Sequence, residues 1–100
     1  MEKEIRVEHG EVVVELKGKI YVDDAADLRE RLLQILSEGK NRFLIKMSEV
    51  HYIDSSGLGV LVAIQKRALE HGGQVRLQGL SGAVKEIFEL TRLTKVFEII

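Results

Sequence analysis

Two adjacent serines, flanked by an acidic residue and two glycines, are the residues of this chain whose types and spacing could do chemistry. They lie in the run Asp54-Ser55-Ser56-Gly57-Leu58-Gly59, just before a stretch with the apolar spacing of a helix. The first turn of a helix presents unpaired backbone N–H groups, which a Ser or Asp side chain can cap. The simplest interpretation is therefore that Asp54 or Ser55 is the N-cap of this helix.

A second interpretation makes one of the serines a phosphate acceptor or part of an anion site. A phosphoryl group there would lie at the positive end of the helix dipole and beside the repelling carboxylate of Asp54. It would add about −1.5 to −2 charges to the surface. Gly57 and Gly59 have no side chains, so another backbone or an enzyme's active site could approach the serines closely. Tight packing of the helix on a sheet explains the same glycines equally well.

Other kinds of chemical site find little support in the residues. A serine nucleophile needs a positioned base, and the only histidines are His9, His51 and His71. His51 is the nearest in sequence to the serines, but four residues along an extended segment is poor geometry for a triad. The histidines also lack the spacing of a zinc site, and the chain has no cysteine. We therefore expect no catalytic residue, no metal and no cofactor.

Nucleotide binding is a remote alternative. Gly57-Leu58-Gly59 lacks the third glycine of the dinucleotide fingerprint, and no glycine is followed by Lys and then Ser or Thr. Only the N-terminus of a helix could then hold phosphates. A small nucleotide-binding or hydrolytic domain is therefore the weakest of the functions considered.

Length and charge exclude several further classes. The 100 residues are expected to form a single domain, residues 1–100. The 15 Lys and Arg against 16 Asp and Glu give a net charge of −1, which is not that of a strongly basic nucleic-acid binder. The longest apolar run, Val60-Leu61-Val62-Ala63-Ile64, is far shorter than the ~20 residues of a membrane helix. The charged N-terminus does not resemble a signal peptide, so we expect a cytoplasmic protein without direct contact to nucleic acid or membrane.

Alternating residues predict a β-hairpin over residues 4–17. Apolar and charged side chains alternate in two short segments, at Ile5 and Val7 and again at Val12, Val14 and Leu16. Between them Gly10 can take the positive φ of a tight turn. Gly18 is expected to end the second strand.

The remaining elements are expected to alternate between helix and strand. One helix begins at Asp23 and Asp24, another extends from Leu58 to a glycine cap at 71–73, and a third is capped by Ser81. Short strands are expected at 43–47 and 75–77, with a last strand or its remnant at 96–100, and a polar loop at 48–53. After the hairpin this order indicates an α/β fold with parallel strands and right-handed crossovers. Tyr21 falls in a loop and is a candidate contact residue.

The residues from 52 to 61, Tyr52-Ile53-Asp54-Ser55-Ser56-Gly57-Leu58-Gly59-Val60-Leu61, resemble the signature of the STAS domain, and specifically of bacterial anti-sigma factor antagonists. The similarity extends to Leu16-Lys17-Gly18, to Gly72-Gly73, and to Ala83-Val84-Lys85, Phe88 and Leu93. It implies a mixed β-sheet with helices packed against it.

The resemblance also implies a function by partner switching. Ser55 would be phosphorylated by an anti-sigma factor that is also a serine kinase, and a serine phosphatase would reset it. The unphosphorylated form would bind the anti-sigma factor and free the sigma factor, as a monomer or weak dimer. The expected partner-binding residues are Tyr21, Asp23, Asp24, Asp54, Ser55, Ser56, Gly57, Leu58 and Gly59.

Two departures from the family pattern affect these expectations. Lys19 and Tyr21 stand where relatives carry acidic residues, which leaves the identity of the partner open. The chain also ends at Ile100, where relatives continue into a final helix, and an uncovered surface would then favour dimerisation through an apolar patch. The main alternative is a STAS scaffold or accessory domain that is not phosphorylated, of the stressosome or transporter-associated kind.

Overall fold

The computed structural model describes residues 1–100, in which strands and helices alternate after an N-terminal hairpin. The elements are β1 (Glu2–Glu8), β2 (Glu11–Ile20), α1 (Val22–Ser37), β3 (Arg42–Ile53), α2 (Ser55–Glu70), β4 (Gln74–Gln78), α3 (Gly82–Leu90), the 3₁₀ turn η1 (Leu93–Lys95) and β5 (Glu98–Ile99). The predicted order of elements is confirmed, and the last strand is present as a two-residue remnant.

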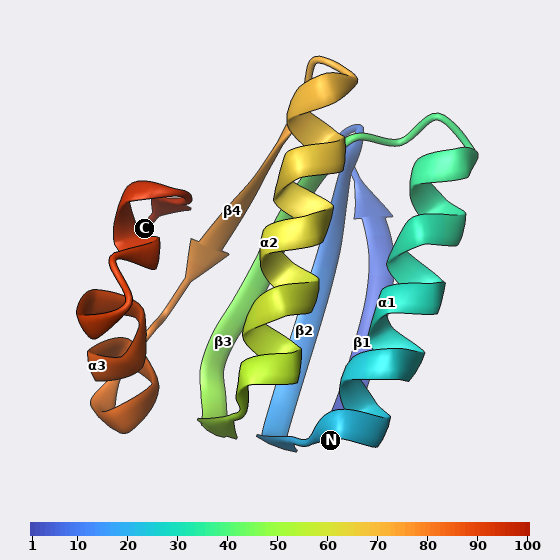
Figure 1. Ribbon diagram of the computed structural model, residues 1–100. Helices are drawn as coiled ribbons and strands as arrows, with labels where there is room; N and C mark the ends of the chain where they lie inside the picture. The colour runs from blue at the N-terminus through green and yellow to red at the C-terminus, as the bar shows by residue number, and fades with distance from the viewer.

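The five strands form one sheet in the order β1-β2-β3-β4-β5 (Figure 1). β1 pairs with β2 in antiparallel fashion, whereas every later pair is parallel. This confirms the α/β class with a mixed sheet. Because β2, β3 and β4 are parallel, their carboxyl ends point the same way, toward the bottom of Figure 1, where β2 and β3 end together.

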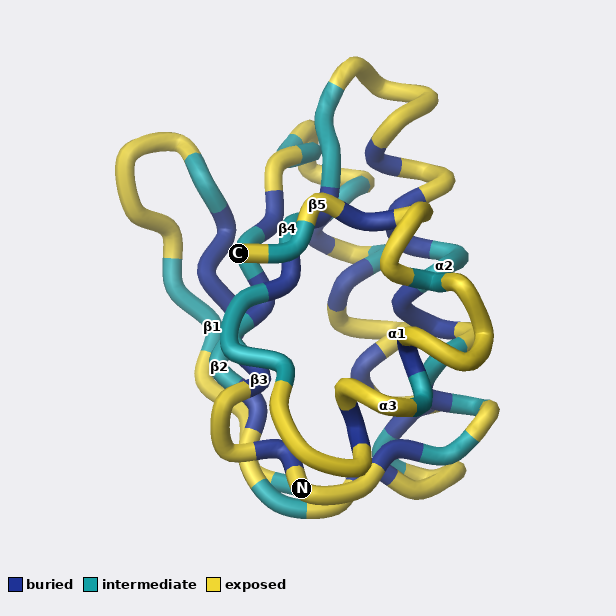
Figure 2. Tube along the Cα trace, turned by 90° about the vertical axis from the view of Figure 1, so that its left-hand side faces the viewer, coloured by how far each residue is buried: buried dark blue, intermediate teal, exposed yellow.

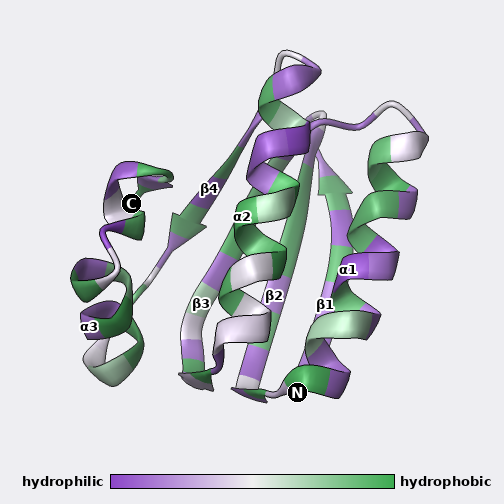
Figure 3. Ribbon diagram, viewed as in Figure 1, coloured by the Kyte–Doolittle hydropathy of each residue, from purple (hydrophilic) through white to green (hydrophobic).

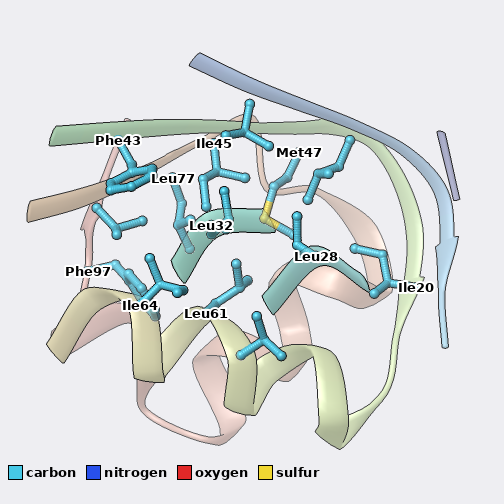
Figure 4. Close-up of a cluster of buried hydrophobic side chains, with 14 of the residues drawn as sticks. Ile20, Leu28, Leu32, Phe43, Ile45, Met47, Leu61, Ile64, Leu77 and Phe97 are labelled. Atoms are coloured by element: carbon cyan, nitrogen blue, oxygen red, sulfur yellow. The ribbon is translucent and has the colours of Figure 1, made fainter. Parts of the chain in front are cut away.

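All three helices cover one face of the sheet, so the molecule has two layers (Figure 2). Along α1 and α2, apolar and polar stretches alternate because each helix buries one side (Figure 3). A cluster of 22 buried apolar residues fills the space between the layers. Ile45 and Leu77 from the sheet meet Leu32 and Leu61 from the helices there, as Figure 4 shows. No helix is long and apolar enough to cross a membrane.

The other face of the sheet is bare of helices and carries paired charges. Arg6 Nε donates to Glu8 at 2.6 Å, and Arg76 donates to both carboxylate oxygens of Glu11 at 2.9 Å. Arg6 also pairs with Glu15 across the strands. These charged side chains lie on the same face of the sheet as Val13. The residues before and after Val13 in β2 point into the core, and side chains alternate along a strand, so this face is the one opposite the core. The uncovered face is thus ionic and does not present an apolar patch.

Two predictions about strand ends were wrong. β2 does not end at Gly18 but continues to Ile20, because Gly18 adopts a φ of +91° where the pairing with β3 shifts register. Residues 48–53 are not a polar loop but the second half of β3. Their pairing with β2 is interrupted by register shifts between Glu15 and Lys17 and between Gly18 and Lys19, each placing an extra residue in β3. Such bulges break the apolar alternation from which a strand is recognised.

Candidate functional site

The segment with the two serines lies where the carboxyl ends of β2 and β3 meet the start of α2. The backbone N–H of Asp54 donates to the carbonyl of Ile20 at 3.2 Å, which ties the end of β3 to the end of β2. Tyr21 follows β2 directly and Ser55 opens α2. Residues from two chain segments, around 21 and around 55, therefore share one rim of the molecule.

Asp54 is the N-cap of α2. Its backbone is extended, with φ −91° and ψ 179°, and its Oδ1 accepts a hydrogen bond from the N–H of Gly57 at 3.0 Å. Its carbonyl accepts from the N–H of Leu58 at 3.1 Å. The sequence left open whether Asp54 or Ser55 caps the helix. The carboxylate of Asp54 is the cap, so the hydroxyl of Ser55 is not needed for capping.

The two serines differ in accessibility. Ser55 is exposed and its hydroxyl makes no hydrogen bond within the chain, whereas Ser56 is partly buried. Ser55 occupies the first turn of a sixteen-residue helix, where backbone N–H groups remain unpaired. The hydroxyl of Ser55 is thus the one that another protein can reach most directly.

Gly57 and Gly59 have different roles. Gly57 is buried, and a Cβ there would lie 2.6 Å from Cγ1 of Ile53 and 3.1 Å from Cγ2 of Ile20. Gly59 is exposed, and a Cβ there would meet nothing within 4 Å. Leu58, between them, is partly buried and packs against the core. Close helix–sheet packing therefore explains Gly57, whereas no contact within the chain requires a glycine at 59.

Two tyrosines form an exposed aromatic contact beside Ser55. The ring centroids of Tyr21 and Tyr52 are 5.3 Å apart with an interplanar angle of 40°. Tyr21 is 49% exposed, Tyr52 41%, and the adjacent Val22 60%. We call these three residues the aromatic step. Tyr21, the candidate contact residue, lies between β2 and α1 and is exposed.

The sequence did not predict that Tyr52 and Val22 are surface residues of the site. Tyr52 reaches Tyr21 because a register shift places His51 as an extra residue in β3, so that Tyr52 pairs with Lys19. Nothing in the local pattern reports such a shift. The only available signal was the position of Tyr52 two residues before Asp54, inside the segment that resembles the family signature.

The two acidic residues at the start of α1 are used differently. The backbone N–H of Tyr21 donates to Oδ2 of Asp24 at 3.0 Å, and this hydrogen bond lowers the pKa of the Asp24 carboxyl below its ordinary value. The amino group of Met1, 3.5 Å from Oδ1, acts in the same direction. Asp24 therefore holds the first turn of α1 in place. Asp23 is exposed and has no ion pair, so its carboxylate can meet a partner.

The three histidines lie apart from one another and from Ser55. His9 lies in the hairpin turn, His51 in the bulge and His71 at the C-cap of α2, all three exposed. No group of three or more His, Cys, Asp or Glu residues could hold a metal ion. A groove lies between the C-terminal ends of α1 and α2, at the opposite end of these helices from Ser55, and is lined by Leu33, Leu36, Ser37, Gly39, Asn41, Arg67 and His71.

A mixed sheet with helices on one face, and a serine exposed on the first turn of α2, defines a small α/β domain. The family model of the STAS domain matches residues 2–100. The anti-sigma-B factor antagonist of Bacillus subtilis (strain 168) is 31% identical over 96 residues, which are 96% of this chain and 87% of that protein. The chain therefore belongs to the STAS domain family.

Solved structures confirm the fold. The protein TM1081 of Thermotoga maritima superposes with a TM-score of 0.92 at 24% identity, covering 97% of this chain and 84% of that one. The unphosphorylated form of the anti-sigma factor antagonist SpoIIAA superposes with a TM-score of 0.82 at 16% identity, over 99% of this chain and 87% of that one. The phosphorylated form of SpoIIAA from Bacillus gives 0.81 at 17% identity, over 99% and 91%.

Proposed function

We propose that this chain is an anti-sigma factor antagonist that works by partner switching in the cytoplasm. The observation that carries the proposal is the exposed hydroxyl of Ser55, free of hydrogen bonds, on the first turn of α2 and on the same rim as the aromatic step. In its unphosphorylated form the chain binds an anti-sigma factor through this rim, and the sigma factor is released. The chain itself is a regulator and catalyses nothing.

Phosphorylation of Ser55 reverses the binding. The phosphate brings about −1.5 to −2 charges into a surface that would otherwise be buried against the partner. A charge that is buried without a counter-charge costs several kcal/mol. Since about 1.4 kcal/mol corresponds to a factor of ten in affinity, a loss of ~3 kcal/mol weakens binding roughly a hundredfold.

The switch needs no refolding of the chain. Asp54 caps α2 and the hydroxyl of Ser55 is unbonded, so adding a phosphate to Ser55 breaks no hydrogen bond within the domain. The N-terminus of a helix tolerates a phosphate well, because its unpaired N–H groups and the dipole favour negative charge. The effect of the modification is then confined to the docking surface.

The partners in this scheme are an anti-sigma factor with serine kinase activity and a serine phosphatase. The kinase must bring its active site to Ser55, and the surface of α2 is open at Gly59, one turn further along the helix. Asp54 precedes Ser55 directly, and the exposed Asp23 follows Tyr21 by two residues, so both carboxylates belong to this rim. Leu58 and Gly57 support the rim from within, since they pack against the core and against Ile53.

The test is phosphorylation followed by binding measurements. The chain is incubated with ATP and each purified anti-sigma-type serine kinase of its source organism, and the modified residue is mapped by mass spectrometry. We expect one phosphate on Ser55, unchanged in Ser56→Ala and absent in Ser55→Ala.

Ser55→Asp is expected to bind the kinase at least tenfold more weakly than Ser55→Ala, for which we expect constitutive binding. Phosphate on Ser56 would refute the choice of residue, and equal affinity of the Ser55→Asp and Ser55→Ala variants would refute the switch. No modification by any kinase would favour an unphosphorylated scaffold.

A further inference from the structure

One unpaired cation lies beside the aromatic step. Lys19 is exposed and its register partner in β3 is Tyr52, so the two residues lie side by side at the carboxyl edge of the sheet. No carboxylate of the chain lies within ion-pair distance of Lys19. By contrast, Lys17, two residues earlier in β2, pairs with Glu49 at 3.4 Å.

Lys19 is also on the same rim as Ser55. The hydrogen bond from Asp54 N–H to the carbonyl of Ile20 joins the residue after Lys19 to the residue before Ser55. A protein that covers Ser55 and the aromatic step therefore also reaches the end of β2, where Lys19 lies beside Tyr52.

The acidic groups around this rim do not neutralise Lys19. The carboxylate of Asp54 accepts from Gly57, and that of Asp24 accepts from Tyr21 and pairs with the amino group of Met1. Asp23 is exposed but forms no ion pair. The rim thus offers a partner the three exposed side chains of the aromatic step, one cation without a counter-charge at Lys19 and one unpaired carboxylate at Asp23.

We infer that the partner, in the function proposed above, sets an apolar side chain on the aromatic step and a carboxylate against Lys19. Exposed tyrosines are common anchors of interfaces, because they bury a large apolar area and lose little conformational entropy. A cationic partner group would be repelled by Lys19, whereas a carboxylate is attracted and guides the encounter.

This arrangement gives the switch a second electrostatic component. A partner carboxylate near Lys19 would also lie on the rim that carries the phosphate of Ser55. Phosphorylation then adds repulsion between like charges to the cost of burying the phosphate. Release should therefore depend on an acidic residue of the partner, and not only on the modified serine.

The test measures affinity for the anti-sigma-type kinase that phosphorylates the chain. Lys19→Glu is expected to weaken binding about tenfold at low salt, and the loss should shrink at ~1 M salt, where the Debye length is only ~3 Å. Lys66→Glu makes the same change of charge at an exposed position of α2 far along the helix, and should alter affinity less than about twofold. Tyr52→Ala should weaken binding about tenfold or more, whereas Leu69→Ala, an exposed apolar truncation at the far end of α2, should not.

A charge exchange locates the partner group. Each acidic residue of the kinase is replaced by Lys in turn, and one of these variants should restore binding to Lys19→Glu. In that pair, phosphorylation of Ser55 should weaken binding less than it does in the wild-type pair. If Lys19→Glu and Lys66→Glu bind equally while Ser55→Asp still abolishes binding, the inference about Lys19 is wrong and the proposed function stands. If the wild-type chain binds no such kinase, both are wrong.

Discussion

Gly57 of α2 lies so close to Ile53 of β3 that a methyl group on Gly57 would come within 2.6 Å of Cγ1 of Ile53. Because Gly57 has no side chain, the first turn of α2 can lie directly against the end of β3. This contact therefore determines where Ser55, two residues earlier, emerges from the surface. The position of the candidate phosphorylation site depends on a glycine that is itself buried.

Gly57→Ala is expected to destabilise the domain. The added methyl group must displace Ile53 or shift the helix, and such overpacking in a core costs about 1–3 kcal/mol. Denaturant unfolding measures the loss. Gly59→Ala is the matched control, because the added group meets nothing there. If Gly57→Ala were as stable as Gly59→Ala, the close packing described above would be incorrect.

Gly59→Ala is expected to raise the stability of the domain and to lower its affinity for the kinase. Alanine in an exposed position within a helix is favoured over glycine by about 0.5–1 kcal/mol, so unfolding should require more denaturant. The same methyl group would stand on the proposed approach to Ser55, and we expect a lower affinity for the kinase and slower phosphorylation. Unchanged phosphorylation in the stabilised variant would place Gly59 outside the docking surface.

Asp24 should make the stability of the domain depend on pH. Its pKa is lowered in the folded state by the hydrogen bond from Tyr21 and by the amino group of Met1. The ionised carboxylate therefore stabilises the fold above the unfolded pKa of about 4, and this contribution is lost as the pH falls through the lower folded pKa. Asp24→Asn should be less stable than the wild type at pH 7, and the difference should disappear in strong acid.

The neighbouring Asp23→Asn provides the control for Asp24. It removes the same charge from the first turn of α1, but Asp23 is exposed and makes no ion pair. Thermal unfolding of both variants at several pH values distinguishes a specific effect from a general effect of charge on the helix dipole. A constant difference between Asp24→Asn and the wild type at every pH would contradict the assigned cause.

Gln65→Leu should loosen the C-terminal segment. Gln65 is only 4% exposed; its Oε1 accepts from the N–H of Val75 at 2.6 Å and its Nε2 donates to the carbonyl of Val96 at 2.8 Å. Without it the buried N–H of Val75 has no partner, which costs about 1–3 kcal/mol. Hydrogen exchange at Val75 should accelerate, whereas Gln34→Leu, on the exposed side of α1, should leave that amide protected. Equal protection of the Val75 amide in the two variants would show that Gln65 does not satisfy it.

The local pattern of residues determined the helices, most of the strands and their order. Apolar side chains recur along a helix or strand with that element's own period, and Asp or Ser at a helix start acts through hydrogen bonds within one turn, so both signals can be read from neighbouring residues. The run from Asp54 to Gly59 was accordingly placed at the start of a helix, and the structure shows Ser55 exposed there.

Only the tertiary structure decided how the rim is built. The bulges that extend β2 to Ile20 and β3 to Ile53 depend on pairing between strands more than 30 residues apart, and this pairing leaves no local signal. The same pairing brings Tyr52 to Tyr21 and Lys19. Contacts between distant segments are set by packing of the whole sheet, because only the folded chain brings their side chains within reach of one another.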